Sequence, residues 1–117
     1  ILLSQNKSFG NSTVTVAHSR SKDLEKLCLE SDIIISAIGI PEFIKGDMIK
    51  KGSSIIDVGI TRVKDPLSPK GYRITGDVDF KSVSSKVGYI TPVPGGVGPM
   101  TISMLLKNTL KACEISD

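Results

Sequence analysis

The segment Ile90–Thr101, which reads ITPVPGGVGPMT, contains the residue types that most clearly predict a binding function. Pro92 and Pro94 restrict the backbone of this loop. Three glycines admit positive φ and let another molecule approach the main chain; they are Gly95, Gly96 and Gly98. Pro99 suits the first position of a following helix, whose free N–H groups favour a polar or anionic ligand. The loop therefore predicts a ligand site, although a plain strand-to-helix connection remains open.

A second candidate for ligand chemistry is the tripeptide Ser19-Arg20-Ser21, which follows a β-branched run. In a dinucleotide-binding fold, the end of such a strand meets the adenosine ribose, and a 2′-phosphate there requires cationic and hydroxyl donors. Arg20 supplies the cation, and Ser19 and Ser21 supply hydroxyls. This tripeptide predicts NADP as cofactor, with NAD still possible. The alternative is that a serine caps the next helix while Arg20 is solvated.

Further candidates lie at the ends of two apolar runs, because ligands of open parallel sheets gather at the carboxyl ends of the strands. Ala37 and Gly39 end the first run and Ile60 ends the second. Gly39 would let a cofactor pass close to the backbone, unless it only ends the strand in a tight turn. Asp57 is predicted to accept hydrogen bonds from nearby amides, and Asp77 to make local hydrogen bonds outside the site.

The elements that must position these residues follow from short apolar runs that alternate with helix-period segments. The predicted strands are Thr13–His18, Asp32–Gly39, Ser54–Ile60, Ile74–Val78 and Tyr89–Val93. The predicted helices are Lys22–Glu30 and Met100–Ile115, and Thr61–Arg73, with its prolines and glycine, is predicted to be a surface loop. The fold class is α/β: a Rossmann-like, largely parallel sheet with helices on both faces.

Composition excludes several classes of function. With 39% hydrophobic and 23% charged residues, the chain is typical of one globular domain. Its charge of +3 comes from scattered lysines, so no nucleic-acid partner is expected. The longest apolar stretch, Ile33–Ile40, is far shorter than the roughly 20 residues of a membrane-spanning helix, so no membrane partner is expected. Cys28 and Cys113 are predicted to be reduced packing residues in helices, and no metal site is predicted around them or the single histidine, His18.

The loop ITPVPGGVGPMT and the upstream run DIIISAIGIPEFIKGDMIKKGSSIIDVGI together resemble the nicotinamide-cofactor domain of the bifunctional methylenetetrahydrofolate dehydrogenase/cyclohydrolase family. The resemblance extends from about His18 to Lys111 in the family's order and spacing. It implies that the main chain of Ile60 meets the nicotinamide and that Thr101 supplies a hydroxyl. It also implies a set of loop residues that border the nicotinamide and face the folate pocket: Pro94, Gly95, Gly96, Val97 and Gly98.

Enzymes of the resembled family oxidise 5,10-methylenetetrahydrofolate with a nicotinamide cofactor and hydrolyse the methenyl product to 10-formyltetrahydrofolate. Their catalytic lysine lies in a Tyr-x-x-x-Lys motif on a preceding folate-binding domain, and neither Tyr72 nor Tyr89 has a lysine four positions later. No catalytic residue is therefore assigned in this chain. The folate substrate would bind through the preceding domain, in a full-length protein expected to be a homodimer.

The resemblance implies that residues 1–117 form a partial NAD(P)-binding domain, incomplete at its N-terminus, in which Ile1–Ser4 would be the last turn of a helix. The first strand and glycine turn of the domain would then lie upstream. The expected location is the cytoplasm, with the mitochondrion possible. A non-catalytic dinucleotide-binding or assembly module remains the alternative function, and the upstream sequence would distinguish it from the enzyme.

Overall fold

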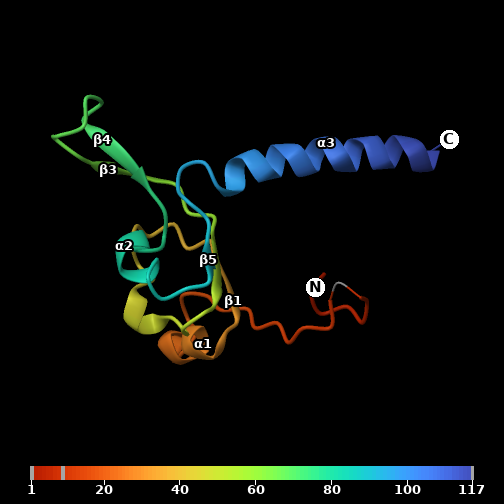
Figure 1. Ribbon diagram of the computed structural model, residues 1–117, viewed down its shortest axis with the longest axis horizontal. Coiled ribbons are helices and arrows are strands. Elements are labelled where there is room, and N and C mark those ends of the chain that lie inside the picture. The colour runs from red at the N-terminus through yellow and green to blue at the C-terminus, as the bar shows by residue number, and fades with distance from the viewer. Residues whose placement is uncertain (1, 9, 117) are drawn as a thin grey trace.

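The structure, a computed structural model, describes residues 2–8 and 10–116, and a parallel sheet lies at its centre (Figure 1). The sheet contains three strands in the order β1-β2-β5, which span Ile33–Ser36, Ser54–Asp57 and Tyr89–Ile90. The isoleucine runs of β1 and β2 suit parallel strands, because β-branched side chains pack well in a sheet. All three strands lie inside longer predicted ones, so the prediction of a largely parallel α/β fold is confirmed.

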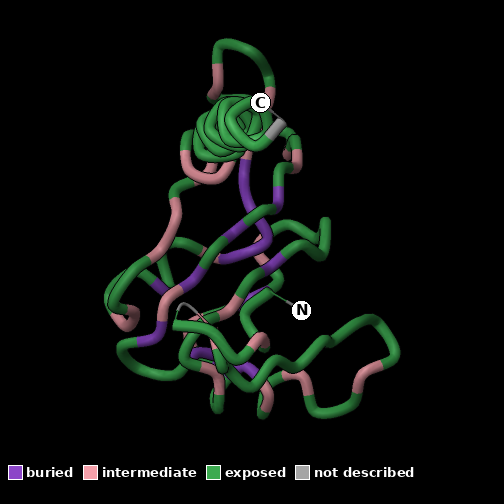
Figure 2. Tube along the Cα trace, turned by 90° about the vertical axis from the view of Figure 1, so that its right-hand side faces the viewer, coloured by how far each residue is buried: buried purple, intermediate pink, exposed green. Residues whose placement is uncertain are grey.

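One face of the sheet is covered. The register pairs Ile34 with Ile55 and Ile55 with Ile90, so these three side chains share that face. Three short helices cover it: α1 (Leu24–Glu30), the 3-10 helix η1 (Gly46–Met48) and α2 (Phe80–Val83). The buried core consists of Cys28, Ile44, Met48, Ile49, Ile55, Val78 and Val83. Figure 2 shows the buried segments gathered along the middle of the molecule.

The opposite face of the sheet carries Ile33, Ile35 and Ile56, which are all exposed. The first turns of helix α3 (Val97–Ser116) share a hollow with Ile56, and the helix then extends away from the sheet (Figure 1). Every residue in 98–115 is exposed. The helix begins before the predicted Met100, so Pro99 occupies its third position instead of the predicted first one.

Strands β3 (Thr61–Lys64) and β4 (Tyr72–Thr75) form an antiparallel hairpin that projects from the sheet. The predicted surface loop Thr61–Arg73 is therefore wrong, because its prolines lie in the turn between the strands, where they interrupt no pairing. The predicted strand Ile74–Val78 is also displaced. Its first two residues end β4, outside the parallel sheet, and Val78 only forms an isolated bridge with Ile44.

The predicted strand Thr13–His18 is wrong. The segment is exposed and belongs to no strand, since it pairs with no strand that the structure describes, and an unpaired extended segment is not a stable strand. Of the predicted helical turn Ile1–Ser4, Ile1 lies outside the described residues and the other three residues form turns. No helix in the described part of the chain is long and apolar enough to cross a membrane.

The two cysteines have different environments, although each lies in a helix as predicted. Cys28 is buried in the core, and this burial raises the pKa of its thiol. Cys113 is exposed on α3, so its prediction as a packing residue is wrong for the structure described. Both thiols are free.

Candidate functional site

The loop between β5 and α3 has one glycine with the predicted conformation. Gly95 has φ of 101°, whereas Gly96 and Gly98 do not have positive φ. A Cβ on Gly96 would lie 2.5 Å from the carbonyl oxygen of Pro92, so close packing within the loop requires this glycine. A Cβ on Gly95 or Gly98 would meet no atom within 4 Å, so the backbone is open to a ligand at both residues. Pro94 is exposed and follows a cis peptide bond.

A hollow of about 730 Å³ lies in the angle between this loop, strand β2 and helix α3. It brings together three of the residues predicted to bind cofactor, which are Gly96, Val97 and Thr101. The other lining residues are mainly apolar: Ile56, Thr91, Met100, Met104, Leu105 and Asn108. The Thr101 hydroxyl donates to the Val97 carbonyl at 2.9 Å, within the helix. A mostly apolar wall with a few polar groups is typical of a cofactor site.

The ends of β1 and β2 are open at the predicted positions. Ala37, Gly39 and Ile60 are all exposed. Gly39 has φ of 78°, and no atom lies within 4 Å of the place where its Cβ would be. The main chain at Gly39 can therefore be approached closely, as the sequence predicts.

Two buried aspartates, Asp57 and Asp77, hold these strand ends. Asp57 accepts hydrogen bonds from backbone amides, which confirms the prediction for it. The prediction of local hydrogen bonds for Asp77 is wrong. Its carboxylate accepts from the amides of Ile38 and Gly39, 39 and 38 residues earlier in the chain. Sequence reasoning missed this aspartate, and the available signal was only a glycine beside a carboxylate at Gly76-Asp77.

The Ser19-Arg20-Ser21 segment forms a turn closed by its own groups. The His18 amide donates to Ser21 Oγ at 2.9 Å, and the Arg20 amide donates to His18 Nδ1 at 3.1 Å. The N-cap residue of α1 is Asp23, so the alternative in which a serine caps this helix is wrong. Ser19 and Arg20 are exposed and Ser21 is half-buried. No hydrogen bond among the described residues joins this turn to the β5–α3 loop.

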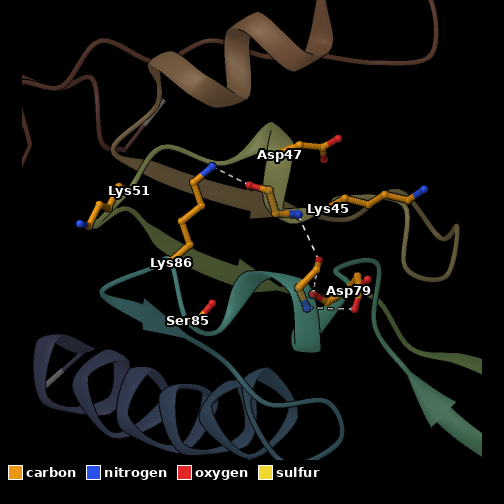
Figure 3. Close-up of a pocket in the computed structure, with 8 residues that line it drawn as sticks. Lys45, Asp47, Lys51, Asp79, Ser85 and Lys86 are labelled. Carbon is orange, nitrogen blue, oxygen red and sulfur yellow. Dashed lines mark hydrogen bonds between the residues drawn. The ribbon is translucent and has the colours of Figure 1, made fainter.

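A second hollow, of about 600 Å³, lies between η1 and α2 (Figure 3) and contains no residue predicted to bind cofactor. Its charged lining is mixed, with Lys45, Lys51 and Lys86 beside Asp47 and Asp79. Two of these groups are already engaged. The Lys86 ammonium donates to the carbonyl of Gly46 at 2.7 Å, and Asp79 accepts from the amide of Ser82 in α2. We assign this hollow a structural role. The described residues contain no group of three His, Cys, Asp or Glu side chains that could hold a metal ion.

The parallel sheet, with its open glycines at the strand ends, defines a Rossmann-like α/β domain of the nucleotide-binding class. The profile of a family described as tetrahydrofolate dehydrogenase/cyclohydrolase, NAD(P)-binding domain, matches residues 1–117. The chain belongs to this family, as the sequence resemblance predicts.

Curated relatives are similar over nearly the whole chain. The chain is 62% identical over 112 residues to a protein from Flavobacterium johnsoniae named bifunctional protein FolD, and this match covers 96% of the chain and 38% of the relative. A protein of the same name from Flavobacterium psychrophilum is 63% identical over 105 residues, which cover 90% of the chain and 36% of the relative. The chain thus spans less than two fifths of the length of either relative.

Solved structures give the same result for the fold. The methylenetetrahydrofolate dehydrogenase-cyclohydrolase from Trypanosoma brucei, complexed with NADP cofactor and inhibitor, has a TM-score of 0.79 at 50% identity over 90% of this chain and 36% of its own. The bifunctional enzyme FolD from Campylobacter jejuni has a TM-score of 0.80 at 48% identity, over 93% of this chain and 36% of its own. At these identities and TM-scores, both solved structures share the fold of this chain over most of its length.

Proposed function

We propose that this chain is the cofactor-binding part of an enzyme that oxidises 5,10-methylenetetrahydrofolate with NADP and hydrolyses the methenyl product to 10-formyltetrahydrofolate. The observation that carries the proposal is the open glycine loop beside an apolar hollow, in a chain matched from end to end by the NAD(P)-binding family. Relatives named as bifunctional enzymes favour this function over a non-catalytic module.

The residues present fit a nicotinamide dinucleotide. Gly39, Gly95 and Gly98 leave their backbone open, which an extended cofactor needs for close approach. In the proposed site, Ala37, Gly39 and Ile60 would line the strand ends, and the apolar side chains of the hollow would contact the nicotinamide. The loop completes the site with Pro94, Gly95, Gly96, Val97, Gly98 and Thr101. The bound nicotinamide would supply hydride acceptance, and the chain would bind and orient it.

The partners outside this chain are proposals as well. We propose that folate binds through a domain present in the longer relatives and that the full-length protein is a homodimer. Catalytic residues are assigned to that other domain, because the sequence of this chain lacks the family's Tyr-x-x-x-Lys motif. Relatives from Flavobacterium favour the cytoplasm over the mitochondrion as the location.

NADP is proposed over NAD because Arg20 is exposed and, with Ser19 and Ser21, can meet a 2′-phosphate. The test is a titration of this chain with NADPH and with NADH, followed by cofactor fluorescence. NADPH should bind more tightly, and Arg20→Ala should weaken NADPH binding by about 10-fold to 100-fold, the equivalent of one charge-assisted phosphate contact. NADH affinity should stay unchanged.

Arg62→Ala is the matched control, since Arg62 lies in the hairpin, over the ring of Tyr72 at 5.0 Å. This variant should keep the preference for NADPH. Equal affinities of the unsubstituted chain for NADPH and NADH would contradict the role of Arg20. A folded chain that bound neither nucleotide would contradict the proposed cofactor function of these residues.

A further inference from the structure

The strand ends at the candidate site rest on two aspartates that lie almost entirely inside the protein. Asp77 has no exposed surface and Asp57 is 3% exposed. Asp57 Oδ1 accepts from the amides of Gly59 and Asp77, at 2.9 and 3.0 Å, and Asp57 Oδ2 accepts from the amide of Val78 at 3.0 Å. The side chain that ends β2 therefore fixes the backbone that carries Asp77.

The carboxylate of Asp77 in turn reaches the end of β1. Its Oδ2 accepts from the amide of Ile38 at 2.6 Å, and both of its oxygens accept from the amide of Gly39, at 3.1 and 3.2 Å. The hydroxyl of Ser36 adds a longer contact to Oδ2 at 3.4 Å. Hydrogen bonds from amides to a carboxylate are charge-assisted and stronger than neutral ones. Asp77 thus holds a turn that belongs to no helix or strand.

Two glycines make this arrangement possible. A Cβ on Gly59 would collide with the carboxylate of Asp77, and a Cβ on Gly76 would collide with the carboxylate of Asp57. Neither glycine has positive φ, so both are required for space and not for backbone conformation. The two carboxylates are therefore packed against the backbone of the segments that they hold.

The hydrogen bonds of Asp77 also determine what the turn presents to a ligand. In a planar trans peptide the C=O points opposite to the N–H. Because the amides of Ile38 and Gly39 point inward to Asp77, the carbonyls of Ala37 and Ile38 point outward. Neither carbonyl accepts a hydrogen bond from any residue that the structure describes, and both residues are exposed.

We propose that Asp77 is a positioning residue of the cofactor site and that Asp57 positions Asp77, an inference that rests on the proposed function. Asp77 fixes the end of β1 so that it offers two carbonyl oxygens to hydrogen-bond donors of the cofactor, such as ribose hydroxyls or an amide. Carbonyl oxygens above buried carboxylates repel an anion. This end of β1 therefore favours the uncharged hydrogen-bond donors of the nicotinamide nucleoside over the phosphates.

The first test measures amide hydrogen exchange in this chain without ligand. The amides of Ile38 and Gly39 should exchange at least about tenfold more slowly than the amide of Ile40, which donates to no acceptor among the described residues. Asp77→Asn should remove most of this protection. The side chain of asparagine has one acceptor oxygen and one NH₂ donor, so an N–H group would face the amide of Ile38 or Gly39 in place of an acceptor. Unprotected amides in the unsubstituted chain would overturn the proposal even if the variant did not fold.

Ser53→Ala is the matched control for exchange. Ser53 is also buried and polar, but its hydroxyl donates to Lys50 at the other end of β2, at 2.8 Å. This variant should leave the protection of Ile38 and Gly39 unchanged. If it removed their protection as strongly as Asp77→Asn, the effect would be general destabilisation and the positioning role would be wrong.

The second test compares two ligands, NADPH and adenosine 2′,5′-bisphosphate, which lacks the nicotinamide half. Asp77→Asn should weaken NADPH binding by about tenfold or more and change binding of the bisphosphate by less than about twofold. Equal losses for both ligands, or no loss for NADPH, would overturn the positioning role. An unsubstituted chain that bound neither ligand would reject the proposed function, and the exchange rates would still decide whether Asp77 holds the turn.

Discussion

The residues around the parallel sheet and those of helix α3 differ in how far along the chain their hydrogen-bond partners lie. Near the sheet, Thr91 Oγ accepts from the amide of Asp57, 34 residues away. On α3, the hydroxyls of Thr101, Ser103 and Thr109 each donate to a carbonyl four residues earlier. The polar groups of the first region are satisfied only in the complete fold, whereas those of α3 are satisfied within one helix.

Burial follows the same division. Ile49 and Val83 have no exposed surface in the core beside the sheet, whereas Leu105 and Leu106 on α3 are 65% and 68% exposed. The same substitution should therefore change the free energy of unfolding much more near the sheet than on α3. Pairs of identical substitutions, one in each region, test this difference directly.

The largest difference is expected for glycine. Gly76→Ala would drive a methyl group into the carboxylate of Asp57, and should lower the free energy of unfolding by about 2–4 kcal/mol. In Gly98→Ala, on α3, the added methyl group would have no atom within 4 Å, and the backbone at Gly98 does not have positive φ. This substitution should therefore leave the free energy of unfolding unchanged or raise it by up to about 1 kcal/mol. Urea unfolding of both variants measures the difference. Equal costs would mean that the space beside Gly76 relaxes freely.

The division also separates what the sequence predicts from what it does not. Strands β1 and β2 are predictable because their apolar runs, such as Ile33–Ile35, carry the signal of a buried parallel strand within a few neighbouring residues. The open backbone at Gly39 and Gly95 is predictable for a similar reason, since glycine is the residue that adopts positive φ most readily.

Features that depend on distant partners are missed. The segment Thr13–His18 has the composition of a strand, but a strand also needs a neighbour, and composition does not provide one. Asp77 is underestimated because its partner amides lie at the end of β1, about 40 residues earlier in the sequence, and no short motif links them. The hairpin Thr61–Thr75 is missed because the prolines and glycine between its two short strands are typical of a loop, and the pairing of the strands depends on residues about ten positions apart.

A smaller difference is expected for threonine. Thr91→Val leaves the buried amide of Asp57 without its acceptor and should cost about 1–2 kcal/mol. Thr101→Val removes only a hydroxyl that donates to the carbonyl of Val97 on an exposed helix, and should change stability by less than about 0.5 kcal/mol. Thermal or urea unfolding of the two variants provides the comparison. A cost for Thr101→Val as large as that for Thr91→Val would show that α3 is packed against other groups in solution.

The smallest effect concerns the two cysteines and appears only at alkaline pH. Burial raises the pKa of the Cys28 thiol above its ordinary value of 9.0, so the folded chain binds this proton more tightly than the unfolded chain. The stabilisation from Cys28 is therefore fully present below about pH 9 and is lost as the pH rises through the higher folded-state value.

Cys28→Ala should reduce the fall in unfolding free energy between about pH 8 and pH 10.5, because the group whose proton affinity differs between the two states has been removed. Cys113→Ala is the matched control, since the Cys113 thiol is exposed on α3. Alkylation of the folded chain gives an independent measurement, in which Cys113 should react at least about tenfold faster than Cys28. Cys28 reacting as fast as Cys113 would mean that the core on the covered face of the sheet opens frequently in solution. The two regions would then not differ in how well they protect their side chains from reagents.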